Sequence, residues 1–194
     1  MSRLLLLTGL ALLASTSQAQ ENAGAYFGFS LGSFDYEETE EVTGLVISDS
    51  TSAYRLFGGY RFSDNFAVEG SWGATGDIKE GFSGSDPALG TVTLDIKGDY
   101  EVLSVRALGI LPFDKVSLFG GVGYYDADLT ARGRYEDAFQ IVAIKVEGSD
   151  DGATVIGGLQ FDLDRLSIRG EYEWFDTDSN VDASDISIGL LFNF

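Results

Sequence analysis

Apolar and polar residues alternate with a period of two along most of the chain after residue 20, which predicts strands rather than helices. The C-terminal segment is the clearest example, because Ile186, Ile188, Leu190, Phe192 and Phe194 share one face, opposite mainly small or polar residues. Eight segments follow the pattern, at residues 23–35, 52–62, 66–76, 98–111, 116–127, 152–162, 166–175 and 183–194. Each is long enough for the ~9–11 residues with which a strand crosses a membrane.

The connections between these segments alternate strictly between short and long. The short ones, at 63–65, 112–115 and 163–165, are tight, polar and rich in Asp. The long ones, around 36–51, 77–97, 128–151 and 176–182, are strongly acidic. Short periplasmic turns and longer extracellular loops alternate in this way in outer-membrane barrels. The pattern therefore predicts an all-β fold, an eight-stranded antiparallel up-and-down transmembrane β-barrel.

Aromatic residues gather near both ends of the predicted strands, as rings do at the two interfaces of a membrane. The short-turn group is Tyr60, Phe62, Phe66, Phe113, Phe161, Phe192 and Phe194, and the long-loop group is Phe34, Tyr54, Trp72, Tyr124 and Trp174. The alternative is a soluble lipocalin-like barrel or sandwich with its apolar face inward. The membrane barrel is favoured because it explains both the apolar face and the charged face opposite it.

The N-terminal residues predict export from the cytoplasm. Arg3 precedes an apolar run at 4–14, and the small residues Ser17 and Ala19 follow. This is the pattern of a secretory signal peptide cut after Ala19. The apolar run is shorter than the ~20 residues of a membrane-spanning helix. We therefore expect a signal peptide at 1–19 and a barrel domain at 20–194.

Composition narrows the chemistry that the chain can perform. There are 12 Lys and Arg against 31 Asp and Glu, a formal charge of −19, which argues against a nucleic-acid partner. The chain has no His and no Cys, so the commonest general base, metal ligand and nucleophilic thiol are missing. The run at 176–182 begins like a calcium loop, but Val181 replaces the turn glycine and Ser187 the bidentate Glu. We expect no enzymatic activity, no cofactor and no dedicated metal site.

Several motifs together resemble the OmpA and OmpX type of small outer-membrane barrel, the porin-like outer membrane protein β-barrel group. They are Ala25-Tyr-Phe-Gly-Phe-Ser-Leu-Gly, Tyr54-Arg-Leu-Phe-Gly-Gly-Tyr-Arg-Phe, Phe119-Gly-Gly-Val-Gly-Tyr-Tyr, Arg169-Gly-Glu-Tyr-Glu and the terminal Phe194. The resemblance implies a place in the Gram-negative outer membrane. It also implies that Leu190, Phe192 and Phe194 form the C-terminal signal read by the barrel-assembly machinery. OmpA-like proteins often continue into a peptidoglycan-binding domain, and we expect no such tether after Phe194.

The face opposite the apolar one carries charged residues that would point into the lumen. Gln160 and Glu173 share this inward face. The candidates for a lumen charge network are Arg55, Arg61, Glu69, Arg106, Arg169 and Glu171. An eight-stranded barrel is just wide enough for its interior side chains to fill it. Desolvated charges must pair, so the network is expected to plug the lumen, with a gate as the alternative.

These inferences predict a structural or surface-interaction role carried by the extracellular loops. The alternative is a narrow porin-like channel for ions or small solutes. An outer-membrane enzyme ranks lower, because familiar barrel enzymes resemble one another in relying on a catalytic His. The expected partners are outer-membrane lipid and lipopolysaccharide, the barrel-assembly machinery during insertion, and an extracellular ligand of the loops.

Overall fold

The computed structural model describes residues 23–39, 46–76, 78–86, 90–136, 141–177 and 181–194. The signal peptide predicted at 1–19 lies outside these residues. The described strands are β1 (Gly24–Thr39), β2 (Val46–Ser63), β3 (Phe66–Thr75), β4 (Ile78–Asp86), β5 (Gly90–Phe113), β6 (Val116–Glu136), β7 (Ile141–Leu163), β8 (Leu166–Phe175) and β9 (Val181–Asn193). No helix in the described ranges is long and apolar enough to span a membrane.

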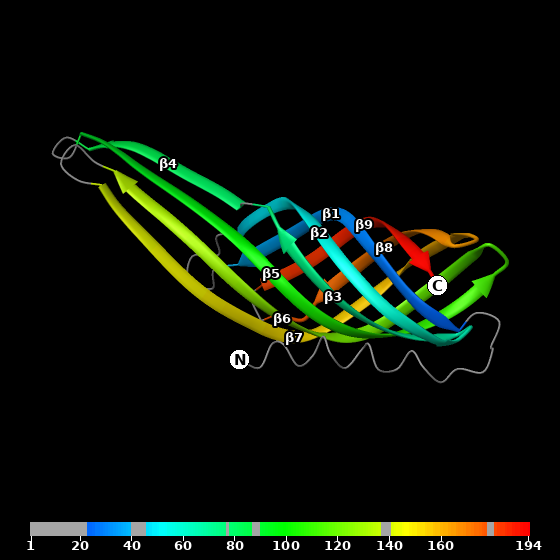
Figure 1. Ribbon diagram of the computed structural model, residues 1–194. Helices are drawn as coiled ribbons and strands as arrows, with labels where there is room; N and C mark the ends of the chain where they lie inside the picture. The colour runs from blue at the N-terminus through cyan, green and yellow to red at the C-terminus, as the bar shows by residue number, and fades with distance from the viewer. Residues whose placement is uncertain (1–22, 40–45, 77, 87–89, 137–140, 178–180) are drawn as a thin grey trace.

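Eight of the strands close into a ring, which confirms the predicted fold (Figure 1). Neighbours pair antiparallel in the order β3-β2-β1-β9-β8-β7-β6-β5, and pairing of β3 with β5 completes the circle. The first and last strands of the chain, β1 and β9, lie side by side. Each of the eight predicted segments corresponds to one strand of this ring.

Two-residue turns join the ring strands at one end of the barrel. They are Asp64-Asn65, Asp114-Lys115 and Asp164-Arg165. Asp114 and Asp164 have φ angles of 57° and 55°, a left-handed conformation that Asp adopts more readily than most residues. The Asp-rich short connections are therefore the tight turns that the sequence predicted.

The long connections differ from the prediction, because much of their length is strand. β4 pairs with residues 90–98 of β5, and β6 and β7 pair without interruption up to Glu136 and Ile141. The result is a four-stranded projecting sheet that extends beyond the ring, formed by β4 with residues 90–98 of β5, 128–136 of β6 and 141–152 of β7 (Figure 1). Residues 92–97, Val-Thr-Leu-Asp-Ile-Lys, alternate with the same period of two as the barrel. The length and acidity of these connections indicated loops, whereas the period-two alternation within them indicates the strands that the structure contains.

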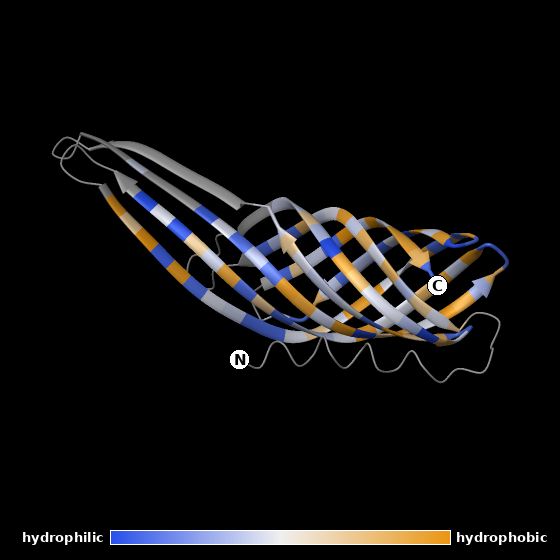
Figure 2. Ribbon diagram, in the orientation of Figure 1, coloured by the Kyte–Doolittle hydropathy of each residue, from blue (hydrophilic) through white to orange (hydrophobic). Residues whose placement is uncertain are grey.

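Hydrophobic and hydrophilic residues alternate along the strands (Figure 2). This alternation gives the barrel an apolar outer wall and a more polar inner wall. On β9, Ile186 and Ile188 are 58% and 66% exposed, whereas Ser187 between them is buried. Tyr54, Tyr124 and Trp174 face outward near the projecting sheet, as predicted for an aromatic belt. Phe34 was wrongly assigned to that belt. It is buried and packs against Phe175, because it lies an odd number of residues from the outward-facing Phe27, Phe29 and Leu31.

Two apolar layers fill parts of the barrel interior. The layer nearer the short turns contains Tyr26, Phe57, Ala67, Leu108, Ile110, Phe119, Ile156 and Leu191. The layer nearer the projecting sheet contains Phe34, Tyr125, Ala127, Phe175 and Ala183. Large inward side chains are accommodated where a neighbouring strand presents a glycine. A Cβ on Gly158 would lie 2.6 Å from Cζ of Phe119 and 2.2 Å from the carbonyl oxygen of Gly170.

Replacing this inward glycine should destabilise the barrel, whereas replacing an outward one should not. Gly158→Ala is expected to lower the free energy of unfolding by about 1–3 kcal/mol, because Phe119 and the β8 backbone must both move. Gly170→Ala is the matched control, since a Cβ there would meet nothing within 4 Å. Urea unfolding of the two variants in detergent micelles measures the difference. Equal stabilities would contradict the close packing described here.

Candidate functional site

A cluster of charged side chains crosses the lumen between the two apolar layers. It consists of three guanidinium groups and four carboxylates, which we call the lumen network: Arg55 on β2, Glu69 on β3, Arg106 on β5, Arg169, Glu171 and Glu173 on β8, and Asp185 on β9. All of these residues are buried. Each lies on the inward face of its strand, so the period-two alternation directs all of them to the barrel axis.

Glu69 lies at the centre of one half of the lumen network. Its Oε1 is 2.7 Å from Nη2 of Arg106, and its Oε2 is 2.6 Å from Nη1 of Arg169. The hydroxyl of Tyr26 also donates a hydrogen bond to Oε2, at 3.0 Å. Glu69 is 0% and Arg106 is 1% exposed. One carboxylate therefore joins strands β1, β3, β5 and β8 across the lumen.

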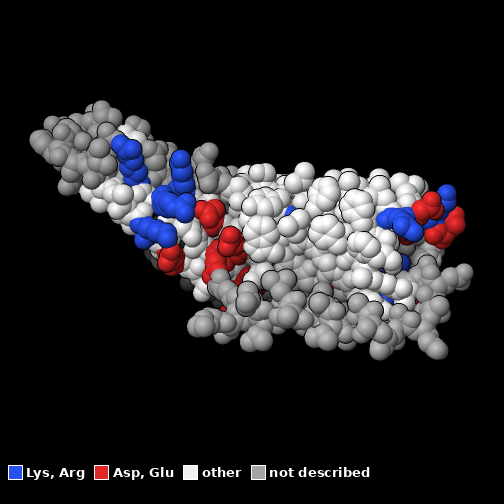
Figure 3. Space-filling view, in the orientation of Figure 1, with Lys and Arg blue, Asp and Glu red and all other residues white. Residues whose placement is uncertain are grey.

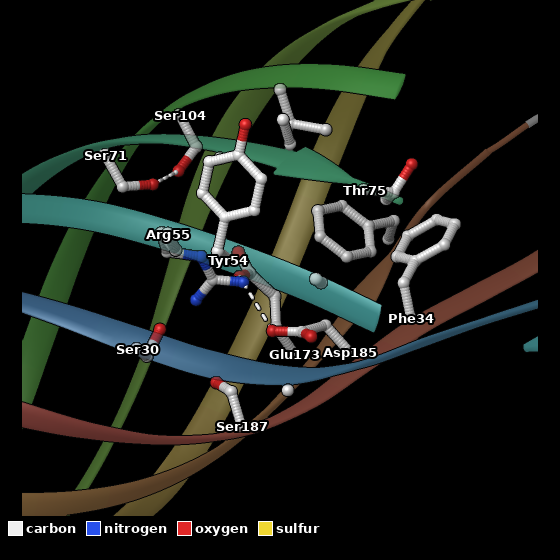
Figure 4. Close-up of a pocket in the computed structure, with 16 residues that line it drawn as sticks. Ser30, Phe34, Tyr54, Arg55, Ser71, Thr75, Ser104, Glu173, Asp185 and Ser187 are labelled. Atoms are coloured by element: carbon white, nitrogen blue, oxygen red, sulfur yellow. Dashed lines mark hydrogen bonds and ion pairs between the residues drawn. The ribbon is translucent and has the colours of Figure 1, made fainter. Parts of the chain in front are cut away.

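Glu173 forms the centre of the other half (Figure 4). Its Oε2 is 2.7 Å from Nη2 of Arg55 and 3.0 Å from Nη1 of Arg106, and Thr154 donates a hydrogen bond to its Oε1 at 2.7 Å. Arg55 additionally pairs with Glu171, and its Nη2 lies 2.7 Å from Oδ2 of Asp185. Arg106 therefore connects the two halves, because it contacts both central carboxylates.

Arg169 lies where the lumen network meets the apolar layer nearer the short turns. Its guanidinium carbon is 4.8 Å from the ring centroid of Phe119, 5.1 Å from that of Phe57 and 5.6 Å from that of Tyr26. A cation over aromatic faces is attracted by their quadrupoles, more strongly where water is excluded. Gln160 accepts hydrogen bonds from Nε and Nη2 of Arg169, at 3.3 and 3.2 Å. The contacts fix the guanidinium on several sides.

The structure brings five of the six predicted network residues together and places the sixth elsewhere. Arg61 lines the cavity at the short-turn end. It lies six residues from Arg55 along β2, a distance of about 20 Å, which puts it outside the lumen network. Arg106 and Glu171 belong to one network but are linked through Arg55 and Glu173.

Glu173 was predicted to face the lumen but was not among the six network candidates, and the structure places it at the centre of one half of the network. Two further residues of the site were not predicted. Asp185 is directly opposite Glu173 in the pairing of β8 with β9, which only the strand register reveals. Tyr26 belongs to an apolar stretch, and nothing in its sequence context indicates that its hydroxyl reaches Glu69.

The acidic run at 176–182 includes residues 178–180, which lie outside the described part of the chain. Elsewhere in the described residues, no group of three or more acidic side chains is arranged to hold a metal ion. The four lumen carboxylates instead contact arginines, at distances of up to 3.8 Å.

A closed ring of antiparallel strands, with an apolar outer wall and a polar inner one, is the construction of membrane-spanning β-barrels. The chain belongs to the outer membrane protein β-barrel family, since the model of the outer membrane protein beta-barrel domain matches residues 4–194. Membership places it in the outer membrane. Among curated proteins, no relative matches the chain by sequence.

Solved structures of small outer-membrane barrels share the fold. One is Ail, the attachment invasion locus protein of Yersinia pestis, in complex with the heparin analogue sucrose octasulfate, with 22% identity, a TM-score of 0.54, and coverage of 88% of this chain and 99% of Ail. Neisserial surface protein A has 14% identity and a TM-score of 0.57, with coverage of 90% and 100%. OprG from Pseudomonas aeruginosa has 14% identity and a TM-score of 0.55, with coverage of 91% and 99%. At these identities the likeness shows the fold alone.

Breaking the link between Arg106 and Glu69 should reveal energetic coupling inside the lumen. Arg106→Gln and Glu69→Gln are each expected to lower the free energy of unfolding by about 3–5 kcal/mol, because each leaves buried charge without its partner. The double variant should lose at least ~1 kcal/mol less than the sum. Unfolding in urea gives all four values.

The control for this cycle is the exposed pair of Arg132 and Asp99, whose side chains are 60% and 35% exposed and 3.3 Å apart. Arg132→Gln and Asp99→Asn should each cost less than ~1 kcal/mol, because water and salt screen the pair. Simple additivity of Arg106→Gln and Glu69→Gln would contradict a coupled network.

Proposed function

We propose that the lumen of this barrel is closed to ions and solutes by the lumen network, and that the protein acts at the cell surface through the chain that projects beyond the barrel. The proposal of a closed lumen is supported mainly by the position of the buried charged residues, which cross the barrel between two cavities. A cavity of about 310 Å³ near the short turns is lined by Gln160 and Arg169, among other residues. On the other side of the network, a cavity of about 30 Å³ is lined by Arg55, Glu173 and Asp185.

Passage of an ion through the lumen network would cost free energy, which supports a closed lumen. A permeating ion would have to separate buried pairs such as Arg106 and Glu69, and each separated charge would lose its partner in a poorly solvated space. The cavity beside Arg55 leaves little free space for water, about 30 Å³. The apolar layers on both sides of the network limit hydration further.

Recordings from planar lipid bilayers test the closed lumen. We expect the purified protein to give no steady channels, because the pairs that cross the lumen leave no continuous aqueous path. A known porin inserted under the same conditions is the control for incorporation. Steady channels of uniform size would overturn the plug and favour the narrow channel for ions or small solutes.

The surface role is supported by the projecting sheet. It continues well beyond the aromatic belt of the barrel, so its side chains lie outside the membrane. In this proposal the barrel wall contacts outer-membrane lipid and lipopolysaccharide, and the projecting sheet contacts an extracellular ligand. We propose no catalytic role, because neither the lumen network nor the projecting sheet contains a histidine or cysteine to serve as base or nucleophile.

We also propose that Leu190, Phe192 and Phe194 form the signal read by the barrel-assembly machinery. Leu190 and Phe192 lie on the outward face of β9, and Phe194, which directly follows the strand, is 85% exposed. The backbone N–H of Phe194 donates a hydrogen bond to the carbonyl oxygen of Ala25 at 3.1 Å. This contact does not involve the side chain of Phe194. The exposed ring is accessible to a recognising protein, which supports the proposal.

Phe194→Ala should therefore reduce the amount of assembled barrel in cells several-fold while leaving the stability of the refolded protein within about 0.5 kcal/mol of the original. Heat-modified gel migration measures assembly, and urea unfolding measures stability. Phe113→Ala is the control, because this ring is also outward, 63% exposed and close to the short turns. If both variants assemble equally well, the signal does not lie at Phe194.

A further inference from the structure

Three basic residues stand in one row across the projecting sheet. The strand registers pair Lys97 with Arg132, and Arg132 with Lys145. We call these three residues the basic row. Neighbouring strands lie about 4.8 Å apart, so the row extends about 10 Å perpendicular to the strands. Arg134 lies two residues from Arg132 on the same face of β6, which adds a fourth cation beside the row.

The basic row belongs to the face that continues the outer wall of the barrel. On β6, Arg132 is an even number of residues from Tyr124, which faces outward in the barrel. Lys97, Arg132 and Lys145 are all exposed. The opposite face of the projecting sheet continues the inner wall and carries Val142, Ile144 and Val146. The sheet therefore turns its cations outward.

The charge pairs around the basic row are weak competitors for a ligand. Arg132 is 3.3 Å from Asp99, and Lys145 contacts Glu147, but the side chains of Arg132 and Lys145 remain 60% and 56% exposed. Exposed pairs of this kind contribute little in water. A denser anionic ligand can therefore displace these carboxylates from the cations.

An acidic band separates the basic row from the barrel (Figure 3). Glu101 is opposite Asp128, and Asp126 is opposite Asp151, so like charges face each other on neighbouring strands. This band repels anionic groups at the membrane surface below it. The cations beyond it are therefore directed toward a ligand that approaches from outside the cell.

We propose that the basic row binds a linear polyanion, a chain of closely spaced sulfate or phosphate groups, presented from outside the cell. Cations spaced by one strand separation match a ligand whose charges repeat along a line, and each contact releases counterions from that ligand. The proposal rests on the surface role proposed above and names the partner of the projecting sheet. The chain has a net charge of −19, so the attraction comes from the local row of cations and not from the overall charge.

Binding of dextran sulfate to the full barrel in detergent micelles tests the proposal, with uncharged dextran as the ligand control. Lys97→Gln with Lys145→Gln removes two cations from the basic row and should weaken binding about tenfold. Lys115→Gln with Arg165→Gln removes two exposed cations at the short-turn end and should leave binding unchanged. The wild-type affinity should fall steeply as salt rises.

Binding to vesicles that contain lipopolysaccharide is measured in parallel. Three results would overturn the proposal: no binding of dextran sulfate, an equal loss of dextran sulfate binding in the two double variants, or a loss of binding in Lys97→Gln with Lys145→Gln that is seen only with the lipopolysaccharide vesicles. The last would identify phosphates held in a membrane as the partner. The bilayer recordings are independent of this outcome. A conducting barrel that binds dextran sulfate through the basic row would overturn the closed lumen and leave this proposal standing.

Discussion

The rest of the structure depends on closure of the sheet into a ring. Inside a lipid bilayer, each unpaired backbone N–H or C=O costs several kcal/mol, so a spanning sheet has no free edge. Pairing of β1 with β9 and of β3 with β5 satisfies these groups. Closure also sends every second side chain into a narrow lumen. Charged residues on that wall, such as Arg106 and Glu69, then pair mainly with one another and with hydroxyl groups, which is why their contacts are short and shared.

The same alternation has opposite consequences along one strand. Within the barrel the outer face of β6 presents apolar residues such as Val122, whereas beyond it the same face presents Arg132. The medium changes from lipid to water between these two positions, so the polarity of the outward face reverses. The basic residues fall into groups accordingly: Arg55, Arg106 and Arg169 serve the lumen network, and the projecting sheet carries a separate group exposed to solvent. Acidic residues such as Asp99 and Glu147 lie beside this second group and form exposed ion pairs with it.

Much of the fold follows from the sequence, because a period of two and short Asp-rich turns leave few alternatives. The eight ring strands and the position of Glu69, Arg106 and Arg169 on the inner wall needed no structure. The register between strands could be learned only from the structure, because the pairing of β8 with β9 places Asp185 opposite Glu173. Phe34 shows a different error, since its aromatic ring suggested a membrane belt while its place in the alternation directed it inward. The projecting sheet was missed because acidity was given more weight than periodicity at 77–97 and 128–151.

Buried guanidinium and carboxylate groups contact one another directly across the lumen. Solid-state NMR of the barrel in lipid bilayers tests it, by measuring dipolar couplings between the guanidinium nitrogens of Arg106 and the side-chain carboxyl carbons of Glu69 and Glu173. We expect strong couplings to both, consistent with nitrogen–oxygen distances of 2.7 and 3.0 Å. Absent couplings, together with contacts between these side chains and water, would contradict it and describe an open, hydrated lumen.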